Sequence, residues 1–327
     1  MRTFAYSPAG TSGDAVASHS RSVAASYLAG GTSLLDLAKI DVMRPDLVVD
    51  INRLPLKKIE KLSDGRLKIG ALVTNTDLAQ HPVVKSDYTS LSQAILSGAS
   101  TQLRNKATTA GNIMQRVRCS YFRDGVSPCN KREPGSGCAA IGGLNRSVHA
   151  VLGVSDNCIA THPSDMCVAM AAIGARILVE GPEGQREIDF LDFHLLPGDT
   201  PDREHALKPD ELITHVILDA PIGGSRSSYL KLRDRTSYQF SLASSAAIVV
   251  LDGNIITNAR LALGGVSTKP WRAKEAEMVL VGQAAGPSAF AQAADIAMRD
   301  AKPQAHNAYK VPLGKQAIIR NLRNLTA

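Results

Sequence analysis

Apolar and polar residues are patterned along this chain in a way that predicts three successive units, each mixing helices and strands. In the first unit, expected over residues 1–54, short apolar runs predict strands, and apolar residues at helical spacing predict helices between them. The predicted strands cover residues 3–6, 27–29 and 47–51. The predicted helices cover residues 12–24, with Ser12 as a candidate N-cap, and residues 34–40. This order favours a βαβ-like unit.

The second unit is expected over residues 55–221. A β-hairpin at residues 57–72 is predicted, because two strand-like runs flank the turn Ser63-Asp64-Gly65. The remaining predicted elements are helices at residues 75–80 and 88–96, a helix that is capped by Ser164 or Asp165 and runs through residue 173, and strands at residues 175–179, 185–190 and 212–218. Turns and not a linker separate these elements, so we expect one α+β unit.

The third unit is expected over residues 222–327. Three strand-like runs precede three segments with alanine and leucine at helical spacing. The strands are predicted at residues 229–233, 242–251 and 255–263, and the helices at residues 273–281, 288–299 and 313–325. The turn Asp252-Gly253-Asn254 is typical of a hairpin. We therefore predict a three-stranded antiparallel sheet with a helical layer on one face.

Composition narrows the class of protein. The chain has 327 residues, of which 44% are hydrophobic, enough to bury a full core. Its net charge of +7 comes from 37 basic and 30 acidic residues without a long single-sign run, and aromatic residues make up only 4%. A nucleic-acid surface is therefore not expected. No stretch approaches the ~20 apolar residues of a membrane span, and the N-terminus lacks the apolar run of a signal peptide.

Four of the five cysteines lie in one region without apolar periodicity, between the turns at residues 108–112 and 162–165. These cysteines are Cys119, Cys129, Cys138 and Cys158. Glycines and prolines at residues 125–143 disfavour a long helix or strand there. A loop of this length in a compact domain needs something besides a hydrophobic core to order it. Four thiolates on a metal centre would do so, and the odd cysteine count disfavours a complete disulfide framework.

Spacing alone leaves three interpretations of these cysteines open. A [4Fe–4S] cluster suits widely spaced ligands, because its iron corners lie several ångströms apart. Zinc sites usually take cysteines in pairs two to four residues apart, whereas the closest pair here, Cys129 and Cys138, is separated by eight residues. The thiols could also be unligated. Cys167 is expected to be a small buried hydrophobe, and His149 and His162 are expected to be structural residues and not ligands.

A second candidate site is Gly30-Gly31-Thr32-Ser33, between a predicted strand and a predicted helix. Glycines let backbone N–H groups approach an anion, and a helix N-terminus adds a favourable dipole, so a phosphate could bind there. The alternative is a tight turn in which Ser33 caps the helix. Two single residues have similar alternatives: Asp165 could bind ligand hydroxyls or cap its helix, and Lys231 could reach a cofactor or lie on a solvated strand face.

Several motifs stand in a recognisable order. They are YLAGGTSLLD at residues 27–36, QLRNKATTAGN at 102–112, HPSD at 162–165 and LGGV at 263–266. With them the chain resembles, over essentially its whole length, the FAD-binding medium subunits of molybdenum hydroxylases, which include xanthine dehydrogenase and carbon monoxide dehydrogenase. The cysteine segments RCSYF, PCNKR, PGSGC and CIATHPSD, at residues 118–122, 128–132, 134–138 and 158–165, are similar to the medium subunit of bacterial periplasmic aldehyde oxidoreductases, which carries an extra [4Fe–4S] cluster.

The resemblance implies a fold and a set of site residues. The fold is α+β: a two-subdomain FAD-binding fold of the vanillyl-alcohol-oxidase (PCMH-like) type, with the cluster segment inserted at about residues 114–161 (the cysteine loop), and then a C-terminal domain like that of the carbon monoxide dehydrogenase flavoprotein. The FAD pyrophosphate would be cradled by Tyr27, Leu28, Ala29, Gly30, Gly31, Thr32, Ser33 and Leu34. The flavin side would be lined by Thr108, Gly111 and Asn112, the ribityl or pyrophosphate region bound by Asp165, and the ring touched by Ile213 and Lys231. The cluster would be held by Cys119, Cys129, Cys138 and Cys158.

The resemblance also implies a function, that of an FAD-carrying electron-transfer subunit in a heterotrimer. A large partner with a molybdenum cofactor would oxidise aldehydes to carboxylic acids, and a small partner with [2Fe–2S] clusters would pass the electrons to FAD and on to an external acceptor. No catalytic residue for the aldehyde chemistry is expected in this chain. We expect periplasmic localisation by co-export with a partner's signal, or cytoplasmic localisation if no partner carries one. The alternative is a non-catalytic, zinc-stapled assembly subunit without FAD.

Overall fold

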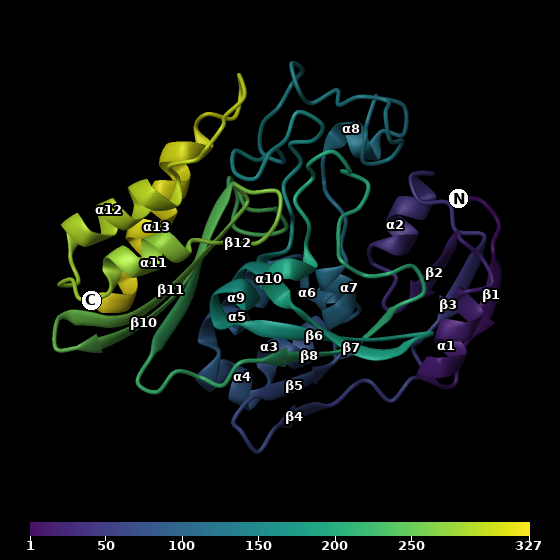
Figure 1. The fold of residues 1–327 in the computed structure, drawn as a ribbon, viewed down its shortest axis with the longest axis horizontal. Coiled ribbons are helices and arrows are strands. Elements are labelled where there is room, and N and C mark those ends of the chain that lie inside the picture. Colours follow the sequence, from purple (N-terminus) through teal and green to yellow (C-terminus); the bar gives the residue numbers. More distant parts are fainter.

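The computed structural model describes residues 1–327 and arranges them around three sheets (Figure 1). In chain order these are a three-stranded, a five-stranded and a four-stranded sheet. Figure 1 shows the first at the purple end of the molecule, the second in the centre and the third beneath the yellow C-terminal helices. The predicted α+β class, with a helical layer on the C-terminal sheet, is confirmed.

The first sheet is parallel, with strand order β1-β3-β2. Its strands are β1 (Ala5–Pro8), β2 (Ala25–Leu28) and β3 (Leu47–Asp50), joined by α1 (Ser12–His19) and α2 (Leu34–Lys39). Helix α1 is capped by Thr11 and not by the predicted Ser12. The Thr11 hydroxyl accepts from the Asp14 amide at 3.1 Å, and the Asp14 carboxylate accepts from the Thr11 amide at 3.2 Å. This reciprocal capping box sets the start of the helix.

The second sheet has the order β4-β5-β8-β6-β7 and is antiparallel throughout. Its strands are β4 (Ile59–Lys61), β5 (Leu67–Gly70), β6 (Ala175–Gly181), β7 (Gly184–Asp189) and β8 (Leu212–Leu218). The helices of this unit are α3 (Asn75–Gln80), α4 (Pro82–Asp87), α5 (Thr89–Ser97), α6 (Thr101–Arg104), α7 (Thr109–Ile113), α9 (Asp165–Ile173) and α10 (Phe190–Phe193). Every residue of α9 is buried, so this helix forms the centre of the largest hydrophobic core.

The third sheet has four strands, so the prediction of three was wrong. Its strands are β9 (Arg226–Leu232), β10 (Ala243–Asp252), β11 (Ile255–Gly264) and β12 (Trp271–Arg272), in the order β12-β11-β10-β9. Strand β12 has only two residues, too few to produce an alternating pattern in the sequence. Helices α11 (Lys274–Leu280), α12 (Pro287–Ala297) and α13 (Lys310–Thr326) cover one face of this sheet (Figure 1).

The cysteine loop contains one short helix, α8 (Ser120–Arg123), and otherwise turns and isolated bridges. Figure 1 shows it as the loops around α8 at the top of the view. Its buried residues, including Phe122 and Ile159, form a small core of their own that also takes in Leu37 of α2. The loop therefore packs against the first unit while it interrupts the second. No helix in the structure has the length and apolar character that a membrane crossing requires.

Candidate functional site

A groove of about 460 Å³ lies between the first unit and the second. Its volume is in the range of cofactor pockets, roughly 300–1,000 Å³. Most of the residues predicted to bind FAD line it: Tyr27, Ala29, Gly30, Gly31, Thr32, Ser33, Leu34, Thr108, Gly111 and Ile213. Residues far apart in the chain therefore meet at one surface, although their contact with FAD stays a prediction.

The turn between β2 and α2 presents a run of unpaired backbone amides to this groove. None of the amides of residues 30–34 donates to a protein acceptor. Ser33 stands at the N-cap position of α2 but makes no side-chain capping bond, so the prediction that Ser33 caps this helix with its side chain is wrong. Half-buried N–H groups without a protein partner need another acceptor. The residues present therefore fit a pyrophosphate bound along this turn.

Gly30 has a packing role in addition to its place at this turn. A Cβ atom on Gly30 would lie 1.9 Å from the carbonyl oxygen of Lys106. The backbone of the second unit therefore crosses the turn at a distance that only glycine permits. Gly31 has φ of +74°, in the left-handed region that also favours glycine. The two glycines set both the shape of the turn and its distance from the opposite wall.

The second wall of the groove was not predicted from the sequence. It comes from the segment before β8 and includes Glu204 and Glu211. Glu204 accepts from Arg116 Nε at 2.7 Å, and Glu211 accepts from Arg186 Nε at 2.6 Å. Burial by itself would raise the pKa of Glu204, but the charges of Arg116 and Lys131 hold it below its usual value. No motif marks this segment; its closeness to Ile213 in the chain was the one available indication.

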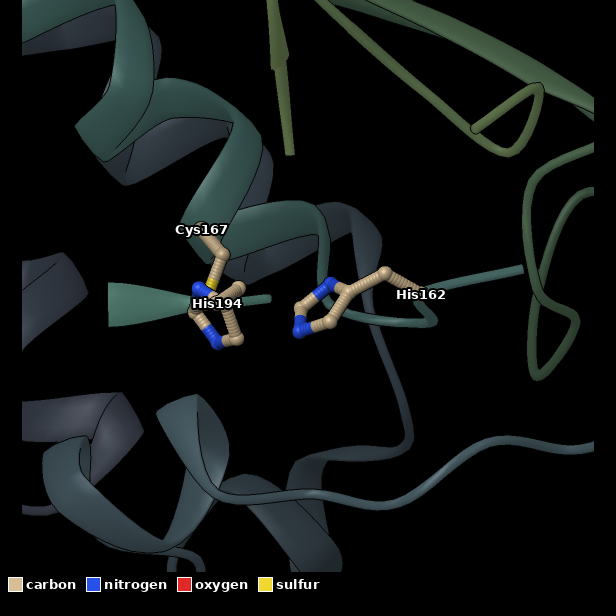
Figure 2. Close-up of side chains that lie close together, drawn as sticks. All are labelled: His162, Cys167 and His194. Atoms are coloured by element: carbon tan, nitrogen blue, oxygen red, sulfur yellow. The ribbon is translucent and has the colours of Figure 1, made fainter. Parts of the chain in front are cut away.

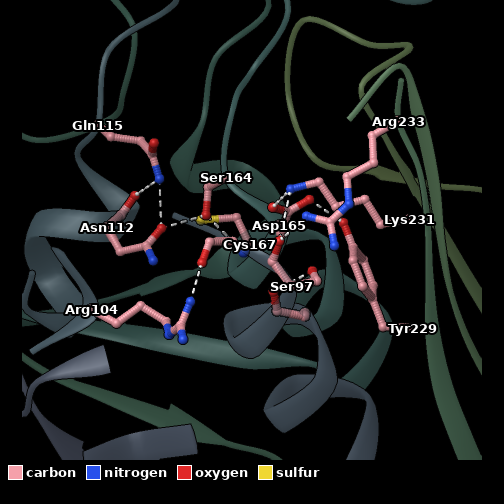
Figure 3. A network of polar contacts seen from close by, with 12 residues as sticks. Ser97, Arg104, Asn112, Gln115, Ser164, Asp165, Cys167, Tyr229, Lys231 and Arg233 are labelled. Carbon is pink, nitrogen blue, oxygen red and sulfur yellow. Dashed lines mark hydrogen bonds and ion pairs between the residues drawn. The ribbon is translucent and has the colours of Figure 1, made fainter. Parts of the chain in front are cut away.

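Leu28, Asn112, Asp165 and Lys231 were also predicted to bind FAD, but they do not line the groove. Figure 3 shows two of them in a buried polar network, in which Lys231 Nζ lies 2.8 Å from the Asp165 carboxylate and the Tyr229 hydroxyl donates to the same carboxylate at 2.6 Å. The Lys231 side chain is only 3% exposed, so the interpretation as a solvated strand residue is wrong. The network joins α9 to β9, and any contact of Asp165 and Lys231 with FAD stays a prediction.

Asn112 and Ser164 form the other half of Figure 3. The Ser164 hydroxyl donates to Asn112 Oδ1 at 2.7 Å and accepts from the Cys167 amide at 3.1 Å. Ser164 therefore caps α9, and Asp165 does not. The same Asn112 oxygen accepts from Gln115 Nε2 at 2.6 Å. These contacts connect the start of α9 to the end of α7, next to the groove.

The four cysteines of the cysteine loop line a single small cavity. They are Cys119, Cys129, Cys138 and Cys158, and none forms a disulfide. Burial raises the pKa of the Cys119 thiol to about 12 and that of the Cys158 thiol to about 11. A buried thiolate would be unfavourable here without a positive partner, so these sulfurs stay protonated thiols unless a metal centre binds them.

The ring of His149 contacts one of these cysteines, Cys119. Its Nδ1 accepts from the Arg146 amide at 3.0 Å, so the proton of the neutral ring lies on Nε2. Burial lowers the pKa of His149 to about 4, which keeps the ring neutral. Nε2 lies 3.3 Å from Cys119 Sγ and donates to it. A hydrogen bond of this kind stabilises the thiolate form of a metal ligand.

His162, Cys167 and His194 form a separate cluster, shown in Figure 2, whose potential ligand atoms lie within 4.8 Å of one another. His194 Nε2 donates to the Ile113 carbonyl at 3.1 Å, so Nδ1 carries a lone pair. His162 Nδ1 accepts from the Ser164 amide at 3.4 Å, so Nε2 carries the proton. A metal ion would need a lone pair from each ring, but here His162 Nε2 is a donor and His194 Nδ1 is an acceptor. This pair of groups fits a bridging water molecule. A cavity of about 30 Å³ adjoins both rings.

Replacing His194 with glutamine should remove part of the acid sensitivity of the protein. Burial lowers the pKa of His194 from 6.5 to about 4, so as pH falls the unfolded chain takes up this proton first. The resulting stability is complete above pH 6.5 and is lost between pH 6.5 and about 4, by up to about 3 kcal/mol. Denaturant unfolding at pH 7 and pH 5 measures this loss. An identical loss in wild type and in His194→Gln would contradict the prediction.

The groove and its free amides fit an anionic cofactor such as a dinucleotide, and comparison with known proteins agrees. Residues 2–221 match the family model described as FAD binding domain in molybdopterin dehydrogenase, and residues 228–325 match the CO dehydrogenase flavoprotein C-terminal domain. The chain belongs to this family of FAD-binding subunits of molybdopterin dehydrogenases.

Individual relatives extend this result. The chain is 50% identical to the aldehyde oxidoreductase FAD-binding subunit PaoB of Escherichia coli (strain K12), over 100% of this chain and 99% of the relative. It is 25% identical to the carbon monoxide dehydrogenase medium chain of Hydrogenophaga pseudoflava, over 91% of this chain and 88% of that one. A solved structure of the carbon monoxide dehydrogenase from Hydrogenophaga pseudoflava matches with a TM-score of 0.78 and 25% identity, covering 99% of this chain and 97% of that one.

The predicted family and the predicted role are thereby confirmed. The chain is an FAD-carrying, electron-transfer subunit of an oxidoreductase, and the zinc-stapled assembly subunit without FAD is not favoured.

Proposed function

We propose that this chain is the flavoprotein subunit of a molybdenum-dependent aldehyde oxidoreductase and that it also holds a [4Fe–4S] cluster. The observation that carries the aldehyde assignment is the 50% identity, over the whole chain, to an aldehyde oxidoreductase FAD-binding subunit. Bound FAD would supply a carrier that can be reduced in one-electron steps and oxidised by a two-electron acceptor. The oxidation of the aldehyde belongs to another subunit, so this chain needs no acid or base for it.

Its own residues would bind and orient FAD. The free amides of residues 30–34 would hold the pyrophosphate, since they face the groove without a protein acceptor. Thr108, Gly111 and Ile213 line the same groove and would contact the flavin half of the molecule. Asn112 would act from behind this wall through its contact with Ser164. Asp165 and Lys231 would have to exchange part of their mutual contact for one with FAD.

The cluster assignment rests on the cysteine cavity. The four cysteines line it together, yet no three of their sulfur atoms lie within 4.8 Å of one another. A tetrahedral zinc ion with Zn–S bonds of about 2.3 Å would draw the sulfurs to about 3.8 Å apart. A [4Fe–4S] cluster takes its ligands at wider separations. By joining residues throughout a loop that has almost no regular structure, the cluster would hold the cysteine loop together.

The partners follow from the same assignment. A large subunit with a molybdenum cofactor and a small subunit with [2Fe–2S] clusters would complete a heterotrimer, and an external acceptor would remove the electrons from FAD. We place the complex in the periplasm if a partner carries an export signal, and in the cytoplasm if none does. The aldehyde would be selected by the large subunit.

Cofactor analysis of the purified native complex and of this chain tests the proposal. We expect flavin absorption bands over a broad iron–sulfur shoulder, with about one FAD and about four iron atoms per copy of this chain beyond those of the partners. Turnover of aromatic and aliphatic aldehydes tests the substrate class. A colourless chain that contains stoichiometric zinc would refute the flavin and cluster assignments together.

A further inference from the structure

One carboxylate lies between the groove and the cysteine cavity and is shared by two cations. Arg116 Nε lies 2.7 Å from Glu204 Oε1, and Lys131 Nζ lies 3.7 Å from the same oxygen. Arg116 and Glu204 line the groove, whereas Lys131 lines the cysteine cavity. Glu204 is therefore the one acidic group in contact with a cation from each of the two sites.

The three side chains are held in place by further contacts. Lys131 is buried, with its side chain 9% exposed, and its Nζ donates to the Pro201 carbonyl at 2.7 Å. The Arg116 guanidinium lies 4.6 Å above the centre of the Phe122 ring and donates to the Lys131 carbonyl at 3.3 Å. Charges fixed in a partly buried setting interact more strongly than charges in water, because less solvent screens them.

We infer that Glu204 couples the flavin site to the cluster site, so that the reduction potentials of both centres depend on this one charge. Adding an electron to either centre adds negative charge, which Arg116 and Lys131 favour and Glu204 opposes. The carboxylate also offsets each cation, so its removal would expose both centres to uncompensated positive charge at once. This inference rests on the proposed function, because it assumes that both cofactors are present.

Glu211 provides a matched comparison. It lines the same groove and pairs with an arginine, Arg186, at 2.6 Å, but it makes no contact with the cysteine cavity. Loss of its charge can therefore influence the flavin without influencing the cluster. Comparing variants of Glu204 and Glu211 therefore distinguishes a charge effect on both centres from an effect on the flavin alone.

The test is a pair of redox titrations on the holoprotein, following the flavin by absorption and the cluster by electron paramagnetic resonance. In Glu204→Gln we expect both centres to become easier to reduce, the cluster by about tenfold in its reduction equilibrium, or about 59 mV for one electron. In Glu211→Gln we expect the cluster potential to stay at its wild-type value. Lys131→Met should make the cluster harder to reduce, and the double variant Glu204→Gln/Lys131→Met should bring the cluster back towards wild type.

Each outcome decides. If Glu204→Gln keeps its FAD and iron but shifts only one centre or neither, the coupling is refuted. If Glu204→Gln does not fold, Lys131→Met decides through the flavin: loss of this cation leaves Glu204 less compensated, so a lowered flavin potential supports the coupling and an unchanged one overturns it. Iron analysis of the wild-type chain comes first, since a chain without cluster iron would overturn the proposed function itself and this inference with it.

Discussion

Serine in place of Cys129 is expected to remove nearly all iron of the proposed [4Fe–4S] cluster from this chain, whereas serine in place of Cys167 should leave that iron in place. Cys129 lines the cavity together with the three other cysteines of the cysteine loop. Cys167 is fully buried in α9, beside His162 and His194 and outside that cavity. A hydroxyl is a poor ligand for iron in such a cluster, since thiolates are what the cluster binds. Iron analysis and the visible shoulder measure the difference.

The Cys167 variant is the control, because it alters a cysteine in the same subunit without touching the cavity. It should still lose some stability, roughly 1–3 kcal/mol, since it buries a hydroxyl in an apolar helix. Lower stability with full iron content is therefore the expected signature. Equal loss of iron in Cys129→Ser and Cys167→Ser would show that the ligand set is wrong. The Cys129 variant should in addition expose the cysteine loop to proteases, as little regular structure remains to hold it.

Alanine in place of Gly30 is expected to strip most of the FAD from the protein. The added Cβ would lie 1.9 Å from the Lys106 carbonyl oxygen and 2.7 Å from its carbonyl carbon. Both are backbone atoms, so no side-chain rotation can relieve the clash and the turn must move away from the second unit. The amides of residues 30–34 would then lose their common orientation. An overpacking cost of about 1–3 kcal/mol corresponds to FAD binding weaker by roughly 5–150-fold.

Gly223→Ala is the matched control for this experiment. Gly223 has an ordinary φ, and an added Cβ would meet no atom within 4 Å. We expect its FAD content and melting temperature to equal those of wild type. FAD released from each purified variant is measured by fluorescence, and circular dichroism shows whether the chain is folded. A folded Gly30→Ala protein with full FAD would contradict the assignment of this turn.

Local sequence patterns predicted most of the elements. The runs over residues 75–80 and 212–218 became α3 and β8 with the same bounds, and the hairpins of the second and third units formed as expected. Helix α4 was missed, although Pro82 at its first turn is a helix-start signal. Strand β12 was missed because two residues have no periodicity. Elements long enough to repeat their pattern were predictable, and short ones were not.

Parts of the candidate site were likewise recognisable from the sequence, and other parts were not. The glycine turn, the flanking motifs and the cysteines were recognisable because each is a contiguous segment or a set of residues with unusual chemistry. The second wall of the groove, which includes Glu204, was not recognisable from the sequence, because a glutamate in a loop has no distinctive pattern. The packing role of Gly30 was not recognisable either, because the atom that requires a glycine there is the carbonyl oxygen of Lys106, far along the chain.

The sequence by itself determined the family, the three α+β units and the residues that could carry a flavin and a metal centre, since these depend on neighbours within a few positions. Only the tertiary structure decided which charged side chains are in contact with one another. Arg116 and Glu204 are 88 residues apart, and Asp165 and Lys231 are 66 apart, yet each pair is in contact. Such contacts depend on how whole elements pack, because any exposed cation could pair with any acid until the fold brings two of them together and shields them from water.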